Sequence, residues 1–186
     1  EIFKKQMGGS FKANRENLHA LVERESFEIN DAAITNLKEL SQFFRLKKLS
    51  VSGTAMTFIT PLKHLTSLRS LQVTNSPIRQ IDSLYVLSDL EELDISNTPL
   101  EDIYATWKLK KLKMLNCSGT QIKRMDVLER LENLEHLDCS NTNVTKLNSL
   151  DYLPLKILKC YNTKVSNRAI ENFKASHPDC NVMYYR

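Results

Sequence analysis

The stretch LEHLDCSNTNVTKLNSLDYL, residues 134–153, shows the pattern that organises this chain. Its core positions are spaced by three and then two residues before a Ser-Asn-Thr segment, and by three residues after it. The next copy upstream begins 22 residues earlier, at Leu112. Self-similarity at a fixed period of about 20 to 50 residues is typical of repeat architectures. The stretch therefore predicts an α/β repeat solenoid built from short coils.

Alignment at this period divides most of the chain into seven units, of which the last begins one residue early after Pro154. Apolar residues at the fourth and sixth positions alternate with polar ones, which predicts a short half-buried strand. Apolar residues at positions 11, 14, 17 and 20 predict 3₁₀ or short helical turns on the outer side. The units begin at Arg24, Leu46, Leu68, Leu90, Leu112, Leu134 and Leu155.

Each unit also carries a turn signal directly after its predicted strand. The eighth position is always Asp, Gly or Asn, the residues that best tolerate positive φ, so we expect a left-handed residue there in every coil. The ninth position is Thr or Ser in all but the first unit, and its inward hydroxyl can bond backbone groups. The eighth-position residues are Asp31, Gly53, Asn75, Asn97, Gly119, Asn141 and Asn162.

One unit departs from the outer apolar pattern. Thr106 occupies a position that is apolar in the other units, and we expect the neighbouring Trp107 to turn inward and fill that space.

The N-terminal segment has the features of a lead-in followed by a cap. Residues 1–10 contain Gly-Gly-Ser and predict a flexible lead-in. Residues 11–24 predict an N-terminal cap helix, with Asn14 as the candidate N-cap; its apolar face includes Leu18, and Phe11 lies just before the helical turns. Such a helix would keep the apolar end of the first coil from water.

The C-terminal segment predicts a second cap. Residues 24–165 hold the seven units, and residues 166–186 predict a helix begun by Ser166 and followed by an edge strand. Because both ends are covered, we expect residues 11–186 to be a single domain and the solenoid to be complete.

The composition fits a folded globular chain of 186 residues, 41% hydrophobic and 26% charged. A net charge of +4 does not indicate nucleic acid without a localised basic face. No apolar run is long enough to span a membrane. The chain begins at Glu1 without Met, which indicates a fragment or processed form. The compartment of the protein therefore stays open between cytoplasm and cell envelope. We expect the protein to be a monomer.

The cysteines follow the repeat period. Cys117, Cys139 and Cys160 are 22 and 21 residues apart, and the chain contains no C-x-x-C pair. Packing as small core hydrophobes explains this spacing without a disulfide or zinc site. We expect neither a metal nor a cofactor.

The averaged unit, L-x-x-L-x-L-S-N-T-x-I-x-x-I-x-x-L-x-x-L, resembles leucine-rich repeats of the 22-residue, internalin-like bacterial subclass. The segment ITPLKHL at residues 59–65 is especially similar, and the resemblance covers residues 24–165. Family members usually carry Asn at the ninth position, where this chain has Thr or Ser. The resemblance implies a leucine-rich repeat arc with a concave parallel β-sheet, convex 3₁₀ or short helical turns, and protein binding on the concave face. It implies no specific ligand.

Third, fifth and seventh positions of each strand should face the concave side, because side chains alternate. In the C-terminal half these positions combine apolar and aromatic side chains with charged ones, as in a binding hot spot. The alternative is that Ile157 and Tyr161 pack against the C-terminal cap. The predicted partner-binding residues are Met114, His136, Ile157, Tyr161, Asp138, Lys159, Glu92 and Asp94.

Other chemistries fit this face less well. His136, Asp138 and Ser140 share one strand face, but a triad needs the base to touch the nucleophile, and here Asp lies between them. Oxygen atoms of Glu92, Asp94, Asn116 and Asp138 could hold calcium. A solvated acidic patch or a docking site for a basic partner explains them more simply. The basic run at residues 107–113 fits a solvated outer face.

The sequence thus predicts a non-enzymatic scaffold that binds a protein partner on its concave face. The alternative is a ligand or glycan recognition module of a larger bacterial cell-surface protein. A third hypothesis, a hydrolase that uses the concave serines, would require activity that depends on His136.

Overall fold

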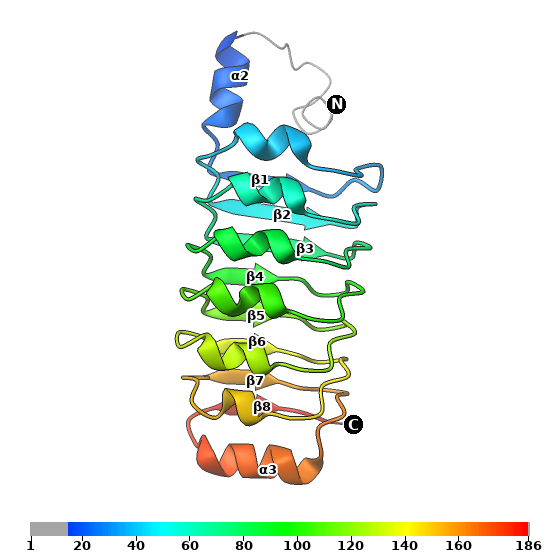
Figure 1. Cartoon of the computed structure of the whole chain (residues 1–186), viewed down its shortest axis with the longest axis vertical. Helices are drawn as coiled ribbons and strands as arrows, with labels where there is room; N and C mark the ends of the chain where they lie inside the picture. The colour runs from blue at the N-terminus through cyan, green and yellow to red at the C-terminus, as the bar shows by residue number, and fades with distance from the viewer. Residues whose placement is uncertain (1–14, 186) are drawn as a thin grey trace.

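The structure, a computed structural model, describes residues 15–185, with side chains from His19 onward. Its strands form one parallel sheet in the order of the sequence, stacked along the long axis of the molecule (Figure 1). Asn14, Phe11 and the lead-in lie outside the described residues, as does the side chain of Leu18. The strands are β1 (Ser26–Ile29), β2 (Lys48–Ser52), β3 (Ser70–Thr74), β4 (Glu92–Asp94), β5 (Met114–Asn116), β6 (His136–Asp138), β7 (Ile157–Lys159) and β8 (Asn181–Met183).

A layer of 3₁₀ helices covers the opposite side of the coils, in front of the sheet in Figure 1. Each lies where apolar residues recur at spacing three, as the sequence predicts, because a 3₁₀ helix has three residues per turn. They are η1 (Lys38–Gln42), η2 (Thr60–His64), η3 (Asp82–Val86), η4 (Tyr104–Lys108), η5 (Asp126–Arg130) and η6 (Asn148–Leu150). The predicted architecture of parallel sheet and convex turns is confirmed.

The strand register follows the repeat period, so equivalent positions of successive coils lie side by side. The side chains at the fourth and sixth positions point inward. Leu137 on β6 and Cys139 directly after β6 are almost fully buried. They join a core that runs the length of the stack. The third positions pair from strand to strand in the order Ser26, Lys48, Ser70, Glu92, Met114, His136 and Ile157.

The turn after each strand is left-handed at six of the seven predicted positions. The asparagines and glycines there have φ between +49° and +68°. The prediction is wrong for Asp31, which is absent from the residues with positive φ. Its carboxylate oxygen instead accepts the Ala33 N–H at 3.0 Å, and its carbonyl accepts the Ile34 N–H. A side-chain turn thus replaces the left-handed residue in the first coil.

The ninth-position hydroxyls satisfy buried backbone carbonyls, as predicted. Thr142 Oγ1 donates to the Cys139 carbonyl at 2.6 Å, and Thr98 and Thr120 make the same bond in their own coils. The expectation for Trp107 is wrong. Thr106 itself is fully buried, because its Oγ1 donates to the Ile103 carbonyl at 2.8 Å and needs no other partner. Trp107 is only half-buried.

Helices flank the stack at both ends: α2 (Arg15–Val22) before β1 and α3 (Asn167–Ser176) before β8. Ser166 caps α3 by accepting the Ala169 N–H at 3.2 Å. Ile170 and Phe173 of α3 are buried in the core, and β8 adds to the sheet beside β7. Figure 1 shows α3 lying across the C-terminal end of the stack. The division of the chain into lead-in, seven units and two caps stays a prediction.

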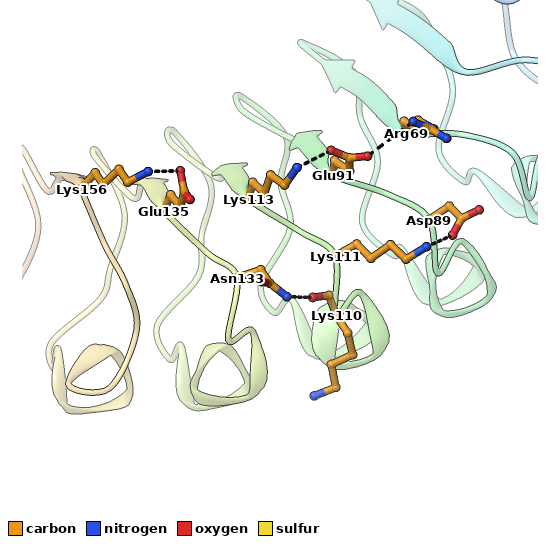
Figure 2. Close-up of polar contacts among 9 residues, drawn as sticks. All are labelled: Arg69, Asp89, Glu91, Lys110, Lys111, Lys113, Asn133, Glu135 and Lys156. Carbon is orange, nitrogen blue, oxygen red and sulfur yellow. Dashed lines mark hydrogen bonds and ion pairs between the residues drawn. The ribbon is translucent and has the colours of Figure 1, made fainter.

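A row of charges runs along the edge where the chain enters the strands (Figure 2). These residues occupy the second position of each unit, and neighbouring coils mostly carry opposite signs. Lys113 Nζ donates to Glu91 at 2.7 Å, and Lys156 Nζ donates to Glu135 at 2.8 Å. The hydrogen bond from Lys113 holds the pKa of Glu91 below its ordinary value of 4.5 and raises the pKa of Lys113. We call these second-position residues the charge ladder: Glu25, Lys47, Arg69, Glu91, Lys113, Glu135 and Lys156.

Candidate functional site

The concave side of the sheet is hollowed between β3 and β7 into a groove of about 490 Å³. Two rows of side chains form its floor, because third and fifth positions point the same way on every strand. The third-position row is Glu92, Met114, His136 and Ile157, and the fifth-position row is Asp94, Asn116, Asp138 and Lys159. We call this surface the concave groove.

Met114 and Ile157 of the third-position row, with His136 between them, form the apolar part of the concave groove, which we call the Met114–Ile157 strip. The Met114 residue is 44% exposed, and His136 and Ile157 are half-buried. In-register pairing places each of them beside the next across β5, β6 and β7. An exposed apolar strip with a polar rim is how protein-binding surfaces are commonly built.

Asp94, Asn116 and Asp138 of the fifth-position row are held in place by bonds to the backbone. Asp94 Oδ1 accepts the Ser96 N–H at 2.9 Å, and Asp94 Oδ2 accepts from Asn116 Nδ2 at 3.1 Å. Asp138 Oδ1 accepts the Ser140 N–H at 3.0 Å. This role was missed in the sequence reasoning, although Asp or Asn two residues before Ser is the signal of a side-chain turn.

Seven of the eight predicted partner-binding residues line the concave groove, and Tyr161 is outside its lining. The half-buried Tyr161 ring packs on Tyr185 after β8, with ring centroids 4.6 Å apart. Tyr161 therefore packs against the C-terminal cap, as the alternative hypothesis expected, whereas Ile157 lines the groove.

The seventh-position hydroxyls are less accessible than the alternation of side chains predicts. Ser140 is 4% exposed, and its Oγ accepts the Tyr161 N–H at 3.2 Å. Ser96 is buried as well. Ser140, which alternation places on the concave face, is therefore not exposed to a partner, because its hydroxyl bonds the backbone of the next coil.

The acidic side chains do not converge on one point. Asp94 lies on β4 and Asp138 on β6, two strands apart, which corresponds to about 10 Å. Among residues 15–185 no group of His, Cys, Asp or Glu has an arrangement suited to a metal ion. In the same range no helix is long and apolar enough to cross a membrane.

The thiols lie on the core side of the sheet. Burial raises the pKa of Cys117 to about 12 and that of Cys160 to about 11, and it raises the pKa of Cys139 well above the ordinary 9.0. The thiolate is the reactive form of cysteine, and a thiol with so high a pKa is almost entirely protonated at neutral pH. These residues serve the packing of the core.

A second hollow of about 510 Å³ lies on the convex side between η4 and η5. Tyr104, Trp107 and Arg130 line it. Lys108 Nζ lies over the rings of both Trp107 and the neighbouring Tyr85, at 5.1 and 5.3 Å from their centroids. This hollow was not predicted from the sequence. The signal in the sequence is the aromatic residue at the same position of two successive units, Tyr85 and Trp107, of which Trp107 lines the hollow.

Comparison with known proteins supports the assignment of the repeats. Residues 110–152 match the family model for leucine-rich repeats in two copies. No curated protein matches the sequence. Among solved structures, the internalin inlF from Listeria monocytogenes is similar, with 26% identity and a TM-score of 0.82 over 93% of this chain and 51% of that one.

Two further structures share the fold. The internalin C2 (inlC2) of Listeria monocytogenes has 21% identity and a TM-score of 0.84, over 100% of this chain and 84% of its own. A leucine-rich repeat protein of Leptospira interrogans has 19% identity and a TM-score of 0.75, over 92% of this chain and 51% of its own. This chain thus spans about half the length of the inlF internalin and of the Leptospira protein.

Proposed function

We propose, from the premise that this chain folds as an internalin-like leucine-rich repeat protein, that it is a non-enzymatic scaffold that binds a protein partner in the concave groove. The contact residues are the two rows of the groove, with Met114 and Ile157 as the apolar anchors. Tyr161, two residues after β7, was predicted with this set but lies outside the groove lining and packs on Tyr185.

The observation that carries this proposal is an exposed apolar strip on a surface with a fixed backbone. Met114 is a large side chain that remains 44% exposed, although the opposite face of the same strand is fully packed. Parallel pairing on both sides holds β5, β6 and β7 in place, so little ordering is needed on binding. A preorganised surface loses less entropy on association and binds more tightly for its area.

Capture of partners by the immobilised domain tests the proposal. Extracts of the cell that produces the protein are passed over the wild type, over Met114→Ser with Ile157→Ser, and over Tyr152→Ser. Tyr152 is 96% exposed and lies in the loop after η6, outside the groove lining, which makes it a matched control for loss of exposed apolar surface. Both anchors point away from the core, so the variants should keep the wild-type circular dichroism and melting temperature.

We expect a protein that is retained by the wild type and by Tyr152→Ser and is lost on the double variant. Truncation of two central apolar contacts should weaken its affinity by at least about tenfold, because hot-spot residues each contribute more than about 1 kcal/mol. If the double variant, correctly folded, retains the same proteins in the same amounts, the concave groove is not the binding site.

A further inference from the structure

We propose that the partner is cationic at the point of contact: it presents an apolar side chain together with a lysine or arginine about 7 Å away. This inference rests on the proposed function and adds the chemistry of the partner. The apolar side chain would lie on the Met114–Ile157 strip, and the cation would lie over Glu92 and Asp94 on β4.

The charge of the concave groove is opposite to that of the chain. Glu92, Asp94 and Asp138 line it with a single lysine, Lys159, which gives a formal charge of −2. The whole chain carries +4 with neutral histidines, so the rest of the molecule carries +6. Acidic residues thus outnumber basic ones on the concave surface that exposes Met114. Complementary charge is the usual means by which an interface selects and steers its partner.

The N-terminal half of the same sheet shows that this concentration is local. The hollow over β1 to β3 is lined by Arg24, Glu28 and Lys48 among small polar side chains, so its charges are of mixed sign. It exposes no large aliphatic side chain at its third and fifth positions. A cationic partner with an apolar anchor therefore fits only the C-terminal half of the concave face.

The spacing of the two rows sets the distance between the partner's groups. Third and fifth positions of one strand are about 7 Å apart, and neighbouring strands are about 4.8 Å apart. Glu92 is the register partner of Met114, and Asp94 lies two residues further along β4. A cation near both carboxylates therefore lies within about 7 Å of a group that packs on Met114.

Lys159 makes the two ends of the concave groove different in charge. Its Nζ is 3.8 Å from Asp138 Oδ2, so the negative charge at the β7 end is partly compensated. Such compensation is absent at β4, where Glu92 accepts only a neutral hydroxyl bond from Ser70 at 2.8 Å among the described contacts. The partner's cation is thus expected at the β4 end and its apolar group toward β7.

The carboxylates of Asp94 and Asp138 are fixed before any partner arrives. The backbone N–H bonds to Asp94 and Asp138 hold their side chains in single orientations, yet each carboxylate oxygen has a second lone pair. Asp94 and Asp138 lie on β4 and β6, about 10 Å apart, which is too far for one small ion to bind both, whereas a side-chain cation of a protein can pair with the β4 carboxylates alone.

Selection from a peptide library displayed on phage tests the inference with a defined probe. Randomised peptides are panned against the wild type, and the selected peptides are then measured by fluorescence anisotropy against Met114→Ser with Ile157→Ser, Glu92→Lys and Glu39→Lys. Glu39 is exposed on η1 of the convex side, so Glu39→Lys changes the net charge equally and leaves the groove intact.

We expect groove-dependent peptides to carry Lys or Arg next to an aliphatic or aromatic residue. Glu92→Lys should weaken them about five- to thirty-fold, because an attraction worth about a factor of five is replaced by a repulsion of similar size. Glu39→Lys should have little effect, and raising the ionic strength to about 0.5 M should weaken wild-type binding.

Two results separate the failure of this inference from the failure of the proposed function. Peptides that depend on Met114 and Ile157 but are neutral or acidic, and bind Glu92→Lys as well as the wild type, would overturn the cationic partner and keep the binding groove. Peptides whose binding is unaffected by the double variant would overturn both.

Discussion

Two glycines at the same position of different coils provide a matched test of the turn that closes each strand. Gly53 and Gly119 have φ of +62° and +68°. A Cβ at Gly53 would meet nothing within 4 Å, whereas one at Gly119 would lie 2.3 Å from Asn97 Oδ1. Substitution by alanine therefore isolates backbone strain at Gly53 and adds a steric contact at Gly119.

The magnitudes follow from these two terms. A left-handed alanine costs about 1 to 2 kcal/mol, and the stiffer unfolded chain offsets about 0.4 to 1 kcal/mol. Gly53→Ala should thus lower the free energy of unfolding by about 1 kcal/mol. Gly119→Ala must also move the Asn97 side chain out of its rotamer, which adds about 0.5 to 1.5 kcal/mol.

Urea unfolding followed by far-UV circular dichroism measures both variants, and an unchanged m-value would show that the comparison is valid. In an Asn97→Gly background the excess destabilisation of Gly119→Ala over Gly53→Ala should disappear. A neutral or stabilising Gly53→Ala would contradict backbone strain at this position, and an excess that survives the loss of the Asn97 side chain would contradict the steric contact at Gly119.

Three further perturbations probe the core, the edge and the C-terminal cap. At about pH 8 Cys117 should not react with a soluble disulfide reagent until urea unfolds the chain, because burial raises its pKa to about 12; rapid native reaction would contradict its packing. The stabilisation from Glu91 is complete above its ordinary pKa of 4.5 and is lost as pH falls through its lowered pKa in the folded state. The melting temperature of the wild type should fall over that pH range, and that of Glu91→Gln should fall less. Identical pH profiles of the melting temperature in the two proteins would show that the pair with Lys113 has no effect. His177→Ala removes the bond from its ring to the Asp151 carbonyl (3.0 Å) and should destabilise the cap by about 1 kcal/mol, seen first as faster amide exchange in α3; unchanged exchange there would contradict this role.

The repeat period alone predicted the strands, their register and the convex 3₁₀ turns, because each coil repeats one local solution. The exceptions occur where a side chain forms a local hydrogen bond that the repeat pattern does not predict. Asp31 uses its own carboxylate to make the turn, and Thr106 satisfies its hydroxyl on the Ile103 carbonyl. Both bonds depend on local backbone geometry that residue type does not fix.

The candidate site was predictable to a similar degree. Alternation of side chains brings Met114, His136 and Ile157 to one face, and the structure places them side by side. Alternation does not predict that a seventh-position hydroxyl bonds the backbone of the next coil, so Ser140 was expected to be exposed and is buried, with its Oγ accepting the Tyr161 N–H. Which of the exposed residues a partner contacts stays a prediction.

The charge ladder has a consequence for how the number of coils can change in descendants of this gene. Loss of the single coil that carries Glu91 would place Arg69 beside Lys113, two cations on neighbouring strands, and like charges in that position are unfavourable. Loss of that coil together with the next, which carries Lys113, would place Arg69 beside Glu135 and restore opposite signs. Unequal recombination that removes or duplicates pairs of coils is therefore better tolerated in this part of the chain than recombination that changes the copy number by one.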